Sequence, residues 1–175
     1  MEILTKDFNQ FIEDIIESGI SAVWLSTEEN VLNKYIEDYK HCVGVIYDVN
    51  KNLIIETNSN KYFEITSGYS NAQYAIQINK LNIESISEQK TFYDKPINYS
   101  RINQLTNIKV KAVKPEIQTI YTKESLLRSI SFYSENKFEF AMIGEDNLRT
   151  HDKLDRPMFD GCWLIIKKEI LDLNK

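Results

Sequence analysis

The stretch from Asp7 to Leu25, DFNQFIEDIIESGISAVWL, joins a predicted helix to a predicted strand. Apolar residues recur at helical spacing in its first half and form one stripe. The stripe consists of Phe8, Phe11, Ile12, Ile15 and Ile16. Gly19 can end the helix, because glycine adopts positive φ without strain. Residues 20–25 are β-branched, apolar and aromatic, which predicts a buried strand. The stretch therefore indicates a protein that mixes helix and sheet.

Two further helices are predicted downstream. Ser26 and Glu29 fit a capping box, and the apolar spacing behind them predicts a second amphipathic helix that ends near Lys40. Its stripe consists of Val31, Leu32, Tyr35, Ile36 and Tyr39. A third helix is predicted to begin at Thr122. Its apolar residues are Leu126, Leu127 and Ile130.

Strands are predicted where short apolar or alternating runs lie between turn residues. They cover residues 43–49, 53–57, 62–66, 73–79, 107–113, 117–121, 137–143 and 162–166. Residues 50–52 suggest a hairpin turn, and Gly68 and Pro115 separate neighbouring strands. Runs of strands that are segregated from helices favour an α+β class. We expect a single domain over residues 1–175 with a mostly antiparallel sheet of about 6–8 strands. Two N-terminal helices and one later helix complete the prediction, and the first strand–helix–strand unit can add one parallel pair.

Composition excludes several classes of protein. The 175 residues are 42% hydrophobic and include 5 Gly, 3 Pro and 2 Cys, which excludes a collagen-like, disordered or disulfide-framework chain. No apolar run approaches the roughly 18 residues that a membrane helix needs. The start of the chain is acidic and lacks an export signal, so we expect a cytoplasmic protein. Cys42 and Cys162 are then expected to be free thiols, although the sequence leaves a disulfide between them open.

The net charge of −5 is unevenly distributed. Residues 1–60 hold 11 acidic and 4 basic residues, whereas residues 80–114 hold 7 basic and 3 acidic ones. An acidic face on the first two predicted helices would attract a basic protein partner. The alternative is that these acids complement helix dipoles and keep the surface soluble. Binding of nucleic acid is not expected, because basic residues are sparse in 80–114 and the whole chain is negative.

A polar stretch over residues 144–161 is the second candidate region. It contains one of the two histidines and two of the four arginines, and a long loop is often functional. The alternatives are a solvated loop held by Arg–carboxylate pairs, a binding loop, or a catalytic loop in which Arg149, His151 and Asp152 converge. No motif marks a nucleophile, a metal ligand set or a cofactor, so we expect no catalytic, metal or cofactor site.

No motif assigns the chain to a family. A small, acidic, intracellular α+β protein without a catalytic signature resembles bacterial immunity proteins, which neutralise a cognate toxin. This profile predicts a protein that binds a basic, nuclease-like toxin domain. The predicted contact residues are Glu13, Asp14, Glu17, Glu28, Glu29, Glu37, Asp38, Glu145, Asp146, Arg149, His151, Asp152 and Asp155. Two alternatives remain: a small enzyme or ligand-binding domain that uses residues 144–161, and a structural or adaptor subunit of a bacterial or phage assembly.

Overall fold

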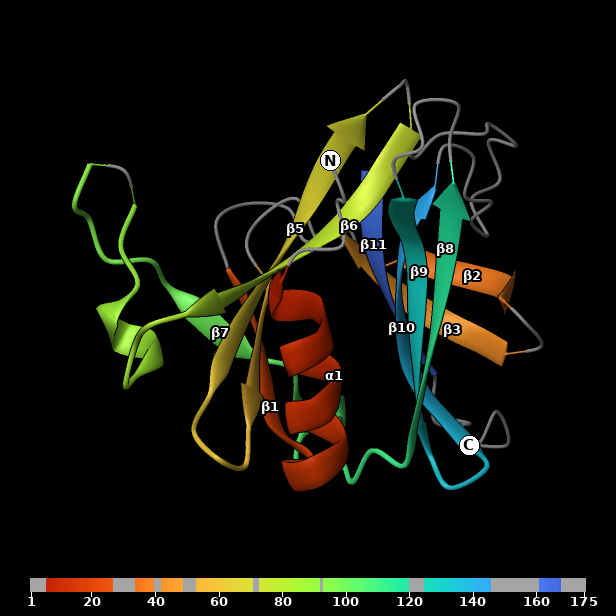
Figure 1. Ribbon diagram of the computed structural model, residues 1–175, viewed down its shortest axis with the longest axis horizontal. Coiled ribbons are helices and arrows are strands. Elements are labelled where there is room, and N and C mark those ends of the chain that lie inside the picture. The colour runs from red at the N-terminus through yellow and green to blue at the C-terminus, as the bar shows by residue number, and fades with distance from the viewer. Residues whose placement is uncertain are drawn as a thin grey trace, which may run out of the picture.

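The computed structural model describes residues 6–26, 34–39, 42–48, 53–70, 73–91, 93–119, 125–145 and 161–167. Within these residues the chain forms one α-helix, two short 3₁₀ helices and eleven strands in two sheets (Figure 1). The helices are α1 (Lys6–Ser18), η1 (Ile86–Glu88) and η2 (Asn103–Leu105). All the strand pairs in both sheets are antiparallel.

The two sheets differ in the part of the chain that builds them. Sheet A has the strand order β6-β5-β4-β1-β7, and sheet B has the order β2-β3-β11-β10-β9-β8. The strands of sheet A are β1 (Ile20–Ser26), β4 (Leu53–Thr57), β5 (Tyr62–Ser70), β6 (Gln73–Leu81) and β7 (Tyr99–Arg101). Those of sheet B are β2 (Lys34–Tyr39), β3 (Cys42–Asp48), β8 (Ala112–Thr119), β9 (Ser125–Ser134), β10 (Lys137–Glu145) and β11 (Gly161–Lys167). Strand β6 of sheet A lies against β9 and β10 of sheet B.

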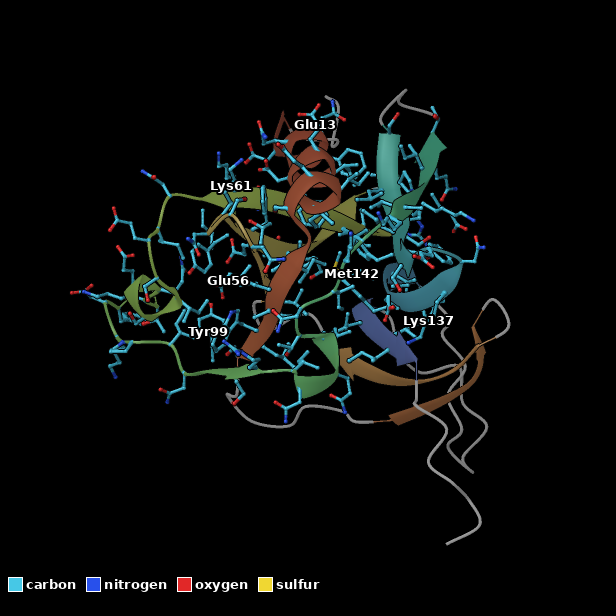
Figure 2. All side chains as sticks on the ribbon, turned by 90° about the horizontal axis from the view of Figure 1, so that it is seen from below. Glu13, Glu56, Lys61, Tyr99, Lys137 and Met142 are labelled. Carbon is cyan, nitrogen blue, oxygen red and sulfur yellow. The ribbon has the colours of Figure 1, made fainter. Side chains whose placement is uncertain are left out.

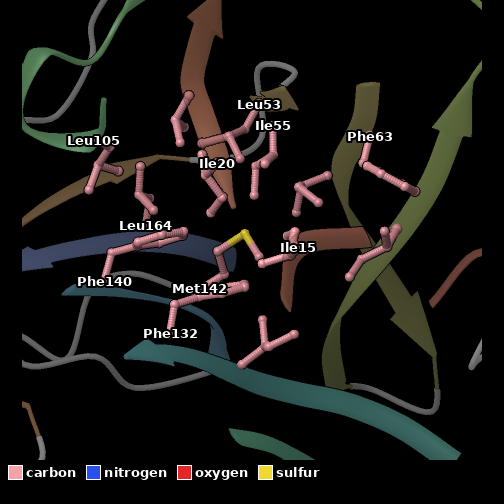
Figure 3. Close-up of a cluster of buried hydrophobic side chains, with 14 of the residues drawn as sticks. Ile15, Ile20, Leu53, Ile55, Phe63, Leu105, Phe132, Phe140, Met142 and Leu164 are labelled. Atoms are coloured by element: carbon pink, nitrogen blue, oxygen red, sulfur yellow. The ribbon is translucent and has the colours of Figure 1, made fainter. Parts of the chain in front are cut away.

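Helix α1 contributes its apolar stripe to the core that the two sheets share. Phe11 is fully buried, and its ring lies 5.1 Å from that of Phe63 in β5 and 6.0 Å from that of Phe132 in β9. Phe132 stacks in turn on Phe140 of β10 at 4.3 Å. Figure 3 shows the side chains of the helix and of both sheets meeting in this cluster. Phe11 thus connects the helix to both sheets through aromatic contacts.

The predicted end of the helix at Gly19 is confirmed. Gly19 has φ +78°, and its N–H donates to the Ile15 carbonyl at 2.8 Å. The Asn58 side-chain amide donates to the Ser18 carbonyl at 2.8 Å, so a second group satisfies the helix C-terminus. The backbone then pairs with Ile108 in both directions, which fixes the start of β1.

We expect Gly19→Ala to lower the free energy of unfolding by about 2–3 kcal/mol. A Cβ at this position would lie 2.8 Å from the Ile108 carbonyl oxygen, which is backbone and cannot turn aside. The left-handed φ adds its own cost for any residue with a Cβ. Chemical denaturation measures the loss. Ser18→Ala, one residue earlier and in right-handed helix, is the control and is expected to cost less than half as much.

The prediction of three helices and one sheet is wrong. Residues 34–39, assigned to a second helix, form β2, and the region around Leu126 and Ile130, assigned to a third, forms β9. In β2 the pairing with β3 shifts between Ile36 and Tyr39, so this strand lacks the regular two-residue alternation by which a strand is recognised in a sequence. In β9 both faces are buried, so the alternation that marks a strand is missing.

The strand predictions are largely confirmed in position but not in pairing. The residues flanking 50–52 belong to different sheets, β3 to sheet B and β4 to sheet A, so the predicted hairpin between them is wrong. Gly68 does not separate two strands, because it lies within β5. The Gln77 side chain occupies the space where a side chain at position 68 would begin. Pro115 lies within β8, which is tolerated because β8 is the outermost strand of sheet B. The expected parallel pair is absent from the described strands.

The register of β3 and β11 separates the two cysteines. In this antiparallel ladder Trp163 is opposite Asp48 and Lys167 is opposite Gly44. Cys42 and Cys162 therefore lie toward opposite ends of the pair, some seven residues apart in register, which is roughly 23 Å. A disulfide needs Cα atoms within about 7 Å. The ladder excludes a disulfide between Cys42 and Cys162 within one chain.

Candidate functional site

The outward side of α1 carries the sequence-predicted site residues that the structure leaves accessible. Successive positions of the helix place four exposed side chains within one sector of its surface. We call this sector the acidic helix face, and it consists of Asn9, Glu13, Ile16 and Glu17. Ile16 is 48% exposed, although it was predicted to belong to the buried stripe. An exposed isoleucine between two glutamates gives the face both an apolar and an anionic component. Glu13 and the nearby Lys61 are labelled in Figure 2.

Asp14, a predicted contact residue on the same helix, is not accessible to a partner. Its side chain is only 3% exposed, and Oδ1 accepts from Lys61 Nζ at 2.5 Å and from Gln10 Nε2 at 3.1 Å. Oδ2 is buried and has no hydrogen-bond partner among the described residues. Lys61 itself is 37% exposed and precedes β5. Asp14 therefore connects α1 to sheet A rather than contributing to a binding surface.

The other predicted contact residues are not brought together with α1 by the described structure. Seven of them lie outside the described residues: Glu28, Glu29, Asp146, Arg149, His151, Asp152 and Asp155. Glu37 and Asp38 lie on β2, at the edge of sheet B, and Glu145 is the last residue of β10. Because residues 34–39 form a strand, Glu37 and Asp38 do not share a helix face as expected. Of the predicted acidic surface, the pair Glu13 and Glu17 is the part that the structure shows exposed on one helix face.

A second group of polar side chains, which the sequence analysis missed, lies on the outer face of sheet A. Glu56 of β4 accepts from Trp24 Nε1 at 2.8 Å and from the Tyr62 hydroxyl at 3.2 Å. Burial raises the pKa of Tyr62, and the neighbouring Glu56 charge raises it further. The guanidinium carbon of Arg101, in β7, lies 4.9 Å from the centre of the Trp24 ring. The sequence carried one signal for this group, the two-residue alternation of β1 and β4. Val23 and Ile55 face the core, so the next residues, Trp24 and Glu56, face the opposite side of the sheet.

Glu64 of β5 lies on the same outer face, opposite the fully buried Ile54. Burial raises the pKa of the Glu64 carboxyl above its ordinary value of 4.5. The folded chain therefore holds this proton more tightly than the unfolded chain. The contribution of Glu64 to stability is then largest below about pH 4.5 and is lost as pH rises through the raised pKa.

We expect Glu64→Gln to unfold at higher urea concentration than the unaltered chain at pH 7, because the desolvated charge is removed. The difference in the free energy of unfolding should shrink as the pH is lowered toward 4.5. Urea unfolding curves at several pH values measure both effects. Glu13→Gln, which changes an exposed carboxylate, serves as the control and should show no comparable trend. A Glu64→Gln difference that is the same at all pH values would contradict the assignment.

Comparison with protein-family models, curated proteins and solved structures finds no match for this chain. No three His, Cys, Asp or Glu side chains within the described ranges are grouped so that they could hold a metal ion. In that same part of the chain, no helix has the length and apolar character needed to cross a membrane.

Proposed function

We propose that this chain is a protein-binding protein, and that the acidic helix face contacts a basic surface of its partner. The observation that carries the proposal is the position of Ile16, which is 48% exposed between Glu13 and Glu17 on a helix whose opposite side is buried. An exposed apolar side chain that is flanked by two carboxylates suits an interface with an apolar centre and a charged rim. The two carboxylates would also accelerate association with a basic partner.

The packing of α1 supports this proposal because it holds the face rigid. Phe11 and Ile15 are fully buried, and Asp14 is fixed by Lys61. A partner would therefore not have to order the backbone of the helix on binding, which removes one of the main costs of association. Only the exposed side chains of Glu13, Ile16 and Glu17 would lose freedom.

More specifically, we propose that the partner is a toxin domain with a basic surface, such as a nuclease, and that the chain is its immunity-type inhibitor. A nuclease needs lysine and arginine side chains to bind phosphates, so its active surface is positive. The exposed carboxylates of the acidic helix face, Glu13 and Glu17, provide the complementary sign. An inhibitor that covers such a surface would block the substrate by occupying its place. The enzyme and adaptor alternatives remain predictions, and the first depends on residues that lie mostly outside the described ranges.

Co-expression tests the proposed class of partner. The chain is produced in a bacterial host together with each protein encoded beside its own gene, and surviving cells are counted. We expect one neighbour to be basic and toxic, and the chain to restore growth through a direct complex seen in size-exclusion chromatography. If none of the neighbouring products is toxic, or if the toxic one is not bound, the immunity-type function is wrong.

A further inference from the structure

A hollow lined by lysine side chains lies at the turn between β9 and β10. Its volume is about 550 Å³, which is within the range of sites for small molecules. The lining residues are Lys109, Lys111, Ser134, Glu135, Asn136 and Lys137. Lys137 is labelled in Figure 2, where it is well separated from Glu13 and hence from the acidic helix face. The hollow is therefore a separate feature, and its interpretation does not depend on the proposed function.

Two segments that are distant in the sequence build this hollow. In the extended segment before β8, Ile108 and Val110 are buried, so the alternate residues Lys109 and Lys111 face outward. The Lys111 N–H donates to the Tyr133 carbonyl at 2.8 Å, which fixes the segment beside the end of β9. The β9–β10 hairpin then turns through Glu135 and Asn136 and supplies the opposite wall.

The charge of the hollow is only partly compensated. Lys137 Nζ lies 4.0 Å from Glu139 Oε1, at the limit of an ion pair, and Glu139 also bonds to the Ser134 hydroxyl. Lys109 and Lys111 form no ion pair with any part of the chain that the structure describes. The lining holds three ammonium groups and one carboxylate, that of Glu135, so positive charge remains in excess when the Glu139 carboxylate beside Lys137 is also counted. Charges of one sign that converge on a concave surface attract a counter-ion more strongly than isolated ones.

We propose that this hollow binds the phosphate groups of a small phosphorylated molecule. A diphosphate or phosphate monoester carries two or more negative charges, which the excess of positive charge in the lining attracts. Lysine ammonium groups are common phosphate ligands in proteins, and the Asn136 amide adds an uncharged donor at the hairpin. The volume accommodates a diphosphate with a further group attached, rather than a long polymer.

Titration with inorganic pyrophosphate, followed by amide NMR shifts at low salt, tests the proposal. We expect the shifts to concentrate on residues 109–111 and 134–137. Lys109→Glu should weaken binding at least tenfold, whereas Lys95→Glu, the same change at an exposed lysine away from the hollow, should leave the affinity within twofold. Glu135→Gln should strengthen binding several-fold, because it removes the only carboxylate in the lining.

Three results would overturn the proposal. The first is a pattern of shifts spread over all lysines, or equal effects of Lys109→Glu and Lys95→Glu, which would indicate unspecific charge attraction. The second is tighter binding of a 15-nucleotide single-stranded DNA than of pyrophosphate, with shifts along residues 80–114, which would indicate a nucleic-acid surface. The third is binding to vesicles that contain phosphatidic acid without any response to pyrophosphate, which would indicate a lipid surface.

Discussion

Replacement of Phe11 by alanine is expected to lower the free energy of unfolding by about 4 kcal/mol. Phe11 is fully buried and contacts Phe63 of sheet A and Phe132 of sheet B through edge-to-face ring pairs. Truncation removes the ring from both contacts and leaves a cavity. The surrounding helix and sheets are packed against one another and cannot move in to fill it. The loss is measured by urea or guanidinium unfolding.

Ile16→Ala is the matched control for Phe11→Ala. It truncates another apolar residue of α1, but one that is 48% exposed, so its effect should stay below about 1 kcal/mol. If Phe11→Ala cost no more than Ile16→Ala, α1 would not pack between the two sheets in solution. Together the two variants separate the buried stripe of the helix from the acidic helix face.

Lys61→Met is expected to cost about 3 kcal/mol at pH 7, because it leaves the buried Asp14 carboxylate without its cation. Asp14 is only 3% exposed and its Oδ2 already lacks a partner among the described residues, so its carboxylate depends on the contact with Lys61 for compensation of its charge. Urea unfolding curves of Lys61→Met and of the unaltered chain at pH 7 measure this cost.

The double variant Asp14→Asn with Lys61→Met is the control, because it removes both charges together. We expect it to recover most of the stability lost in Lys61→Met, since a neutral amide at position 14 can still bond to Gln10. A double variant that is no more stable than Lys61→Met would show that the loss comes from the packing of the Lys61 stem. The buried charge would then not be the cause.

The elements that the sequence predicted correctly are those whose pattern depends on local chemistry alone. Helix α1 has one apolar stripe and ends at a glycine with positive φ, and both features are visible in residues 8–19. Strand β4 coincides with its predicted range, 53–57. In each of these elements the apolar spacing and the terminating residue agree, so no tertiary information was needed.

The elements that were predicted wrongly depend on contacts between distant residues. In β9, Leu126, Leu127 and Ile130 have helical spacing. Both faces of this strand are buried, however, so the spacing of its apolar residues does not distinguish a strand from a helix. The assignment of the consecutive strands β3 and β4 to different sheets likewise cannot be inferred from the sequence between them. Strand β11, from the end of the described chain, pairs with β3, and only this long-range contact decides where β3 lies.

The candidate site was predictable in part. The acidic character of the N-terminal region identified Glu13 and Glu17, which are accessible, but it did not distinguish them from Asp14, which is buried against Lys61. Helical periodicity places Asp14 between the exposed and the buried sectors, so its partner from sheet A decides the outcome. Ile16 was assigned to the core by the same periodicity, although it lies on the edge of the apolar stripe that faces solvent.

Binding of a basic protein partner to the acidic helix face is tested by calorimetry. The toxic neighbour identified by co-expression is titrated with the unaltered chain, with Glu13→Lys and with Glu84→Lys by calorimetry. Both variants make the same charge change at an exposed glutamate, but only Glu13 lies on α1. We predict that Glu13→Lys weakens binding by about tenfold or more, and that Glu84→Lys leaves it within twofold. Equal affinities of the two variants would contradict the claim.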